Sequence, residues 1–333
     1  MSTGAPWRHA PVVPMTVDAP LRLTVGIATR NRPDALRRCL ASIALIEDLV
    51  TEIIVVDDAS DAPIAPVLRR IPEAIAKKTR IIELPQGLGC IIGRNRMMRL
   101  AANEAVLMLD DDAYLIDPGA VMRASEVLRQ NPDVGAVACA QAEADGSPWP
   151  AAMQPSPVDY RCYVPAYIGC AALLRRSAFV KLGGYQESFH FYGEEKDYCL
   201  RLLDAGYDVV YLPDARVAHV PDPASRSPSR YLRYTVRNDC LSALYNEPLP
   251  MLVITMPVRL ARYAAMRRHG RVDDPGGLRW IVGGLIAALP GVWRDRRSMR
   301  WASIRRWRHL KRARPAFVSR PAASAASASA ASM

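Results

Sequence analysis

The stretch "NEAVLMLDDDAYL", residues 103–115, decides the fold class and locates the candidate chemistry. An apolar run at 105–109 leads directly into three adjacent carboxylates, Asp110, Asp111 and Asp112. A short continuous apolar run predicts a buried strand, which places the three acids at its carboxyl end. Because like charges this close repel one another, the cluster indicates either a divalent-cation site or a proton-sharing acid pair. A solvated turn is the simpler alternative.

Apolar runs and helical patterns alternate along the first part of the chain. Strands are predicted at 21–29, 51–60, 79–84 and 104–109, with helices at 33–43 and 87–102 between them. This alternation predicts an α/β fold with a mostly parallel, doubly wound sheet, whose ligands bind beyond the carboxyl ends of the strands. Polar clusters follow three strands at that edge: Thr29-Arg30-Asn31, Asp57-Asp58 and the three aspartates. The coincidence favours a functional site over ordinary surface charge.

The second half of the chain carries a less regular pattern. A strand and a short helix are predicted within 167–185, a helix at 194–206, and a strand at 207–219 that ends at His219. We expect a smaller subregion here, beside the regular part of the sheet.

Composition describes a globular protein with an uneven distribution of charge. Of the 333 residues 50% are hydrophobic and 23% are charged, and the formal net charge is +11. Residues 259–314 hold sixteen Arg and Lys and three Asp, an excess of +13, so the remainder sums to about −2. An enzyme that acts on nucleic acid usually carries basic surface around its site, whereas here the basic part is a C-terminal appendage.

The ends of the chain and the cysteines favour a reducing compartment. Residues 1–20 lack the apolar core of a signal peptide and are predicted to be a flexible, proline-rich lead-in. Residues 315–333 are predicted to form a disordered, low-complexity tail. The seven cysteines are scattered singly, which favours buried, reduced thiols in a reducing compartment. The longest apolar run, 280–293, is too short for a membrane-spanning helix and contains Pro290.

Five segments follow one another between residues 22 and 240: "TVGIATRNRPDALRRCLASI", "EIIVVDDAS", "GLGCIIGRN", "LMLDDDA" and "GGYQESFHFYGEEKDYCLRLLDAGYDVVYLPDARVAH". In this order and spacing they resemble the family 2 glycosyltransferases. The resemblance implies a nucleotide-sugar-binding fold of the GT-A type over residues 21–245, which we expect to be followed by a basic, partly apolar helical extension at 246–314. It also implies transfer of a sugar from a nucleoside-diphosphate sugar to an acceptor hydroxyl, with the smaller subregion on the acceptor side. The basic C-terminal tail is what favours a glycan or a lipid-linked acceptor.

The resemblance assigns the aspartates to metal and sugar binding. Asp110-x-Asp112 matches the family's D-x-D motif, which implies that Asp112 ligates Mn²⁺ or Mg²⁺ and that Asp110 supports the metal or contacts ribose or sugar. Asp111 either points into the fold or supplements the site. His219 lies where the resemblance implies a further contact to the metal or the diphosphate, with a structural histidine as the alternative. A cation suits the reaction because the leaving diphosphate develops negative charge.

Residues beyond the first two strands are implied to bind the nucleoside. By the resemblance, Thr29 and Asn31, with Asp57 or Asp58, contact the base and the ribose. A carboxylate that accepts the ring N3–H favours uracil or thymine, although guanine also offers N–H donors. UDP- or dTDP-sugars, including dTDP-rhamnose, are the donors most compatible with the resemblance. Arg94 is implied as a donor to the diphosphate, with a solvated helix residue as the alternative.

The helix predicted at 194–206 offers a general base for the proton of the acceptor hydroxyl. By the resemblance this base is Glu195, with Glu194 as the alternative; several acids in a first turn also suit the helix dipole. Asp197 and Arg201 are expected to orient the helix as an i,i+4 pair. A protein base opposite the leaving group implies single displacement with inversion.

The basic C-terminal segment favours a membrane surface. Residues 293–314 interleave Trp293, Trp301 and Trp307 with Arg and Lys. This composition suits anionic lipid, so we expect a peripheral enzyme at the cytoplasmic face of a membrane, acting in cell-envelope polysaccharide synthesis. A helix that caps the catalytic domain is the alternative.

Two other classes of function compete with a glycosyltransferase. A sugar-phosphate nucleotidylyltransferase shares the general fold, but it needs a glycine-rich phosphate loop after the first strand, and "ATRNRPD" contains no glycine. A non-catalytic nucleic-acid-binding protein could use the basic tail, but the aspartates and Glu195 would then have no role. We therefore do not expect nucleic acid as a partner.

Overall fold

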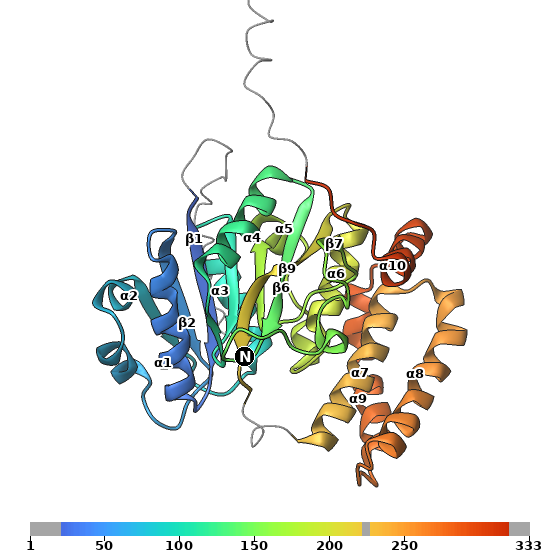
Figure 1. Cartoon of the computed structure of the whole chain (residues 1–333). Coiled ribbons are helices and arrows are strands. Elements are labelled where there is room, and N and C mark those ends of the chain that lie inside the picture. The colour runs from blue at the N-terminus through green and yellow to red at the C-terminus, as the bar shows by residue number, and fades with distance from the viewer. Residues whose placement is uncertain (1–20, 222–226, 320–333) are drawn as a thin grey trace, which may run out of the picture.

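The computed structural model describes residues 21–221 and 227–319 (Figure 1). The predicted lead-in at 1–20 and most of the predicted tail lie outside the described residues. One sheet runs through the centre of the molecule, with helices on both of its faces (Figure 1). This arrangement confirms the predicted α/β class.

The N-terminal half forms the parallel part of the sheet. Its elements are β1 (Leu23–Thr29), α1 (Pro33–Ser42), β2 (Val50–Asp57), α2 (Glu73–Lys78), β3 (Thr79–Glu83), α3 (Cys90–Leu100) and β4 (Ala105–Asp110). β1 pairs in parallel with β2 and β4, and β2 pairs in parallel with β3. The carboxyl ends of β1, β2 and β4 therefore meet at one edge of the sheet, as the sequence predicts.

The second half turns the sheet into a mixed one. Its elements are β5 (Ala113–Leu115), α4 (Pro118–Gln130), β6 (Val134–Ala142), β7 (Cys162–Tyr163), β8 (Ala171–Arg175), α5 (Arg176–Lys181), α6 (Glu194–Asp204) and β9 (Asp208–His219). β8 runs antiparallel to β4 and to β6, whereas β6 and β9 are parallel. The strand order is β3-β2-β1-β4-β8-β6-β9-β5, with β7 paired to β9. The parallel arrangement is thus continuous only up to β4.

The strands are apolar throughout because each face of the sheet carries its own core. Along β2, Ile53 and Val55 belong to one buried cluster, while Ile54 and Val56 belong to the other. α1 and α4 contribute to the first cluster, and α3, α5 and α6 contribute to the second. Burial on both faces explains why the apolar residues of the strand predicted at 51–60 form one continuous run, at 53–56, and do not alternate with polar residues.

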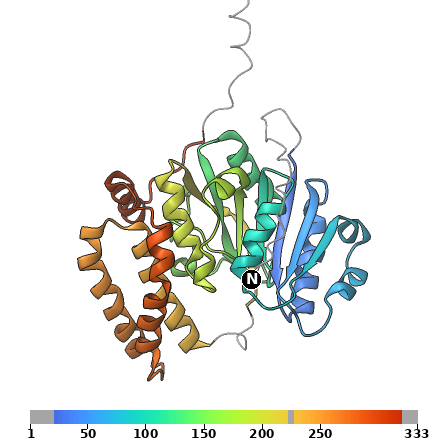
Figure 2. The same cartoon turned by 180° about the vertical axis from the view of Figure 1, so that it is seen from behind.

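Four helices follow the sheet: α7 (Pro228–Asn246), α8 (Leu249–His269), α9 (Gly277–Asp295) and α10 (Trp301–Ala313). α7 packs against α8 and α9, and these helices lie on the side of the sheet away from α1 and α2 (Figure 1, Figure 2). α9 continues through Pro290, the proline within the apolar run at 280–293. Within the described ranges, no helix combines the length and apolarity needed to cross a membrane.

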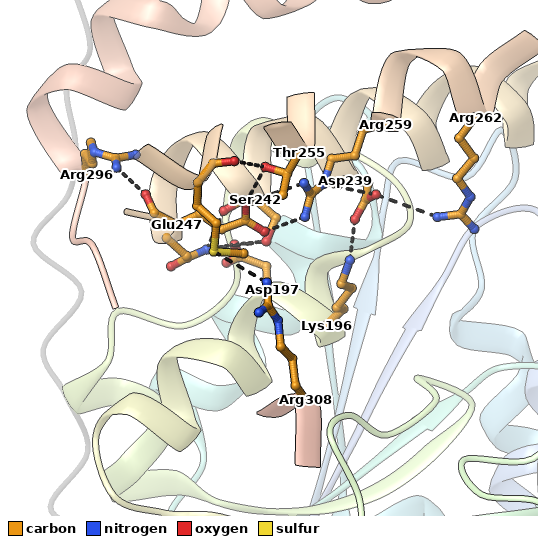
Figure 3. A network of polar contacts seen from close by, with 12 residues as sticks. Lys196, Asp197, Asp239, Ser242, Glu247, Thr255, Arg259, Arg262, Arg296 and Arg308 are labelled. Carbon is orange, nitrogen blue, oxygen red and sulfur yellow. Dashed lines mark hydrogen bonds and ion pairs between the residues drawn. The ribbon is translucent and has the colours of Figure 1, made fainter. Parts of the chain in front are cut away.

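A network of ion pairs fixes the helical extension to the rest of the molecule (Figure 3). Asp239 on α7 pairs with Lys196 on α6 and, at 3.3 and 3.6 Å, with Arg259 and Arg262 on α8. Glu247, which follows α7, also pairs with Arg259. The side chain of Asp239 is only 11% exposed, so removing its partners would leave a shielded charge unpaired. The network therefore couples α8 to α7 and α6.

The chain beyond α10 extends the sheet. α10 packs against α6, as the capping alternative predicts. Residues 315–317 run along β7: Ala316 forms a β-bridge with Cys162, and the rings of Phe317 and Tyr163 meet at 5.4 Å between centroids. The predicted tail thus begins several residues too early, because the apolar ring of Phe317 anchors this part of the chain.

Candidate active site

Strands that end at one edge of the sheet bring the predicted polar residues together. β4 ends at Asp110, and β5 pairs with β9 so that Ala113 lies opposite His219. The backbone N–H of Val220 also donates to the carbonyl of Asp112 at 3.0 Å. As a result, Asp110, Asp112 and His219 offer side-chain ligand atoms that all lie within 4.8 Å of one another.

His219 is held so that one ring nitrogen faces the acidic cluster. Nδ1 lies 2.7 Å from Gln141 Oε1, and the Gln141 amide nitrogen donates to the carbonyl of Met153 at 2.6 Å. The amide oxygen can only accept, so Nδ1 carries a hydrogen and Nε2 is the ring nitrogen that faces the acidic cluster. Nε2 lies 3.4 Å from Asp112 Oδ1, and the Trp149 ring stacks on the imidazole at 5.1 Å. Metal-ligating histidines are commonly fixed in this way.

The donor set fits a divalent cation. Two carboxylates suit Mg²⁺ or Mn²⁺, and the imidazole nitrogen favours a transition metal such as Mn²⁺. Burial raises the pKa of Asp112, but the hydrogen bond and charge of His219 and the charge of Arg32 outweigh burial and hold that pKa below its ordinary value. Asp112 is therefore ionised at neutral pH and able to act as a ligand.

Asp111 points into the fold, one of the two orientations that the sequence left open. It accepts hydrogen bonds from Thr29 Oγ1 at 2.8 Å and from Arg32 Nη1 at 2.9 Å. The same nitrogen of Arg32 donates to Asp112 Oδ2 at 2.9 Å. Burial raises the pKa of Asp111 to about 7, against the lowering effect of Arg32. Asp111 and Asp112 together hold the positively charged guanidinium of Arg32 beside the cluster.

Arg94 links the aspartates to the acids of α6. The residue is only 6% exposed; it donates to Asp110 and, at 2.6 Å, to Glu194 Oε1. Its Nη1 also lies 3.6 Å from Glu195 Oε1. Burial lowers the pKa of Arg94, but the surrounding negative charges, Asp110 foremost, hold it well above its ordinary value. The alternative of a solvated helix residue is therefore wrong, while a contact to a diphosphate stays a prediction.

Glu194 and Glu195 differ in exposure at the start of α6. The Glu194 side chain is 3% exposed, whereas the Glu195 side chain is 18% exposed. Burial, followed by the charge of Glu194, raises the pKa of Glu195 to about 8. A Cβ on Gly169 would lie 2.1 Å from Glu195 Oε1, so only glycine lets the carboxylate rest against this backbone. Glu195 is thus the more accessible of the two acids.

Asp197 fastens the helix that carries these acids. It is fully buried and pairs with Arg201 at 3.0 Å, which confirms the predicted i,i+4 pair. Its other oxygen accepts from Ser242 Oγ at 2.9 Å and from Asn246 Nδ2 at 2.6 Å, both on α7. The position of α6 therefore depends on α7.

The other polar residues predicted to bind the nucleoside hold loops around the same edge. Asn31 is exposed and hydrogen-bonds to the loop after β2. Asp57 accepts from the backbone of Ser60 at 3.1 Å. Asp58 accepts from the N–H groups of residues 88 and 89, at 2.6 and 3.0 Å. Their contacts with a nucleotide stay predictions.

Three residues of this region were not predicted from the sequence: Arg32, Gln141 and Asn238. Asn238 of α7 donates to three carbonyls in the loop 189–192, at 2.7 to 3.0 Å, and this loop leads into α6. Gln141 could have been found as a polar residue near the end of the apolar run at 134–142. Nothing in the local sequence distinguishes Arg32 or Asn238 from surface residues.

Comparisons with known proteins agree with this geometry. The family described as glycosyl transferase family 2 matches residues 24–183, and that described as the N-terminal domain of galactosyltransferase matches residues 151–222. A pre-mycofactocin glycosyltransferase of Mycobacterium tuberculosis is 27% identical over 216 residues, which cover 59% of this chain and 42% of that protein. The chain thus spans about two fifths of the length of this relative.

A second relative and a solved structure extend the comparison. An N-acetylglucosaminyl-diphospho-decaprenol L-rhamnosyltransferase of the same organism is 25% identical over 236 residues, covering 59% of this chain and 75% of that protein. The mannosyltransferase PcManGT from Pyrobaculum calidifontis, solved with GDP-Man and Mn²⁺, gives a TM-score of 0.56 at 20% identity, over 91% of this chain and 88% of its own. The structural likeness confirms the predicted fold.

Proposed function

The chain belongs to glycosyl transferase family 2, and from this we propose that it moves a sugar from a nucleoside-diphosphate sugar onto a hydroxyl of a glycan or lipid-linked acceptor. The proposal rests on the two contacts of Arg94. Its guanidinium donates to Asp110 of the acidic cluster and lies 3.6 Å from Glu195. A candidate cation site and an accessible base are therefore within reach of one side chain. Glycosyl transfer needs both, one for the leaving group and one for the incoming hydroxyl.

Asp110, Asp112 and His219 would hold a divalent cation, Mn²⁺ or Mg²⁺. A cation bound there supplies positive charge against the diphosphate that leaves. Gln141 keeps His219 in the ligating tautomer through its 2.7 Å contact. Arg32, held by Asp112 at 2.9 Å, adds a fixed positive charge at the same place.

Glu195 would accept the proton of the acceptor hydroxyl as its oxygen attacks the anomeric carbon. Glu194 is the second candidate, but its burial and its 2.6 Å hydrogen bond from Arg94 leave it less able to reach an acceptor. Attack from the side of the protein base, opposite the diphosphate, gives single displacement with inversion. Asn238 supports this role because it fixes the loop that precedes α6.

The nucleotide would lie against the residues beyond β1 and β2. Thr29 and Asn31 would contact the ribose or base, and Asp57 or Asp58 would accept the ring N3–H, which favours a UDP- or dTDP-sugar such as dTDP-rhamnose. Arg94 would donate to the diphosphate. The relative named as an L-rhamnosyltransferase supports a deoxyhexose donor, and the diphospho-decaprenol in its name supports a lipid-linked acceptor in cell-envelope synthesis.

A panel of nucleotide sugars tests this proposal. The full chain is incubated with UDP-, dTDP- and GDP-sugars in Mn²⁺ and in EDTA, and the release of nucleoside diphosphate is measured. We expect release from a UDP- or dTDP-sugar in Mn²⁺ and little release in EDTA. If no sugar of the panel is consumed, with or without lipid-linked acceptors, the glycosyltransferase proposal fails.

We also propose that the helical extension binds an anionic membrane surface at its cytoplasmic face. α8 exposes Val253, Ile254 and Val258, with 64 to 76% of each side chain accessible, and α9 exposes Ile286 and Trp293 at 61 and 72%. Residues 259–314, which overlap this part of the chain, carry the basic excess. Exposed apolar side chains beside many Arg residues suit the interface of an anionic bilayer.

Ile254→Asp is expected to weaken co-sedimentation of the full chain with phosphatidylglycerol liposomes, because it places a negative charge on the exposed face of α8. Met122→Asp is the matched control: it replaces a side chain of 55% exposure on α4, outside the extension, and should bind like the wild type. Basic residues near the surface contribute about 1 kcal/mol each and are screened by salt, so wild-type binding should fall in high salt.

Equal co-sedimentation of the two variants would contradict the membrane proposal. Point variants are preferable to a chain that ends at residue 258, because that chain lacks Arg259 and Arg262 and leaves Asp239 with fewer partners (Figure 3).

A further inference from the structure

A pocket of about 720 Å³ opens between α7, α9 and the loop that precedes α6. Arg233, Arg237, Arg279 and His190 line it, together with the ring of Trp280. None of the described residues that line the pocket is acidic. The pocket is therefore strongly basic, although it lies outside the site of the acidic cluster.

Arg237 is a buried cation without a counter-ion. It is 8% exposed, and its Nη1 donates to the carbonyl of Ser188 at 3.1 Å and to Asn238 Oδ1 at 2.9 Å. Both acceptors are neutral, and no carboxylate of the described residues pairs with it. Burial lowers its pKa, which reports the cost of the isolated charge. An anion that entered the pocket would remove that cost.

The neighbouring arginines show which charges are available to such an anion. Arg233 is neutralised by Asp274, whose side chain is 1% exposed. Arg279 is exposed and makes no ion pair with any residue that the structure describes. Trp280 forms one wall, with its ring centroid 5.8 Å from the Arg237 guanidinium. Arg237 and Arg279 therefore carry the uncompensated charge, and guanidinium groups match the oxygens of phosphate in pairs of hydrogen bonds.

One loop connects the pocket to the candidate base. Ser188, which accepts from Arg237, directly precedes the loop 189–192 that Asn238 holds, and His190 of that loop lines the pocket. The same loop leads directly into Glu194 and Glu195 at the start of α6. The pocket and the candidate base are therefore joined by one short loop.

We propose that this pocket binds the phosphate or diphosphate group of the acceptor, with Arg237 and Arg279 as its donors. The inference rests on the proposed transfer to a lipid-linked acceptor, in which a diphosphate joins the reacting sugar to the lipid. Ile286, 61% exposed on the same helix as Arg279, offers an apolar surface for the beginning of the lipid.

Calorimetric titration of the full chain with inorganic diphosphate in EDTA tests the pocket alone, because without a cation the aspartates repel the same ligand. We expect the wild type to bind, and Arg279→Gln and Arg237→Gln to bind about 10-fold more weakly or worse, as for the loss of a charge-assisted hydrogen bond. Arg279→Gln is the decisive variant because Arg279 pairs with no described residue. Arg268→Gln, which removes an exposed charge of α8 outside the pocket, should bind like the wild type.

Failure of this inference is distinguishable from failure of the proposed function, since the release of nucleoside diphosphate is measured separately. The proposed phosphate site would be overturned if the wild type did not bind diphosphate, or if all four proteins bound it with equal affinity.

Binding to phosphatidylglycerol vesicles distinguishes the two possible sources of phosphate, which are the acceptor and a membrane headgroup. If Arg279→Gln weakens vesicle binding as much as diphosphate binding, the ligand is a membrane headgroup and the assignment to the acceptor is overturned. Loss of diphosphate binding alone supports the acceptor.

Discussion

Asp112→Ala is expected to abolish Mn²⁺-dependent transfer while the chain stays folded. The carboxylate of Asp112 is ionised and lies 3.4 Å from His219 Nε2, so its loss removes a ligand from the candidate cation site. Lewis-acid stabilisation of a leaving group is worth several kcal/mol, which corresponds to a rate about 10²–10⁴-fold lower. The measurement is the initial rate of nucleoside diphosphate release in Mn²⁺, with Mn²⁺ affinity from calorimetry.

Asp145→Ala is the control for this variant. Asp145 is an exposed carboxylate in the loop after β6, and its removal should change neither the rate nor the affinity for Mn²⁺. Thermal unfolding of both variants checks that they are folded. A rate for Asp112→Ala close to that of the wild type in Mn²⁺ would exclude Asp112 as a ligand.

Glu195→Gln is expected to keep donor binding and to lose turnover by about 10²–10⁴-fold, the usual contribution of a general base. The change preserves size and removes the basic oxygen. Because the base works as a carboxylate and its pKa is raised to about 8, wild-type turnover should rise as pH increases toward 8 and level off above it. The variant should lack this rise. Steady-state rates across pH, with donor affinity from equilibrium dialysis, measure both effects.

Glu194→Gln is the matched comparison, since the two acids are adjacent and Glu194 is the more buried of the two. An inactive Glu194→Gln beside an active Glu195→Gln would move the base by one residue. Full turnover in both variants would place the base elsewhere in the molecule.

The N-terminal half of the fold was predictable because a parallel strand that is buried on both faces appears in the sequence as a continuous apolar run. β2 and β4 are continuous apolar runs that end in acids, and the sequence predicted both. β8 was predicted as a strand, but its antiparallel place between β4 and β6 was not, because strand order is decided by packing between distant segments. α4 and β6 were not predicted at all. β6 is buried at every position, yet much of it is alanine and glycine, which carry little strand preference.

The site was predictable where side chains stand at strand ends. Asp110, Asp112 and His219 meet because β4 and β9 run in the same direction and β5 adds to β9. The surroundings of Arg94 were not predictable, because its partner Glu194 is 100 residues away along the chain. The tautomer of His219 likewise depends on Gln141, in the strand that the sequence did not predict.

The strand order also sets when the nascent chain can complete its sheet. β4 finds β1 as soon as it is synthesised, but its other edge stays open until β8, residues 171–175, has left the ribosome. Among the strands of the described residues, β6 pairs with β8 and β9, so this buried strand has no partner strand before that point. Between residues 142 and 171, translation therefore passes through a state with one open sheet edge and one unpaired apolar strand. Such edges template pairing with other chains, so this window is where the growing polypeptide most needs a chaperone.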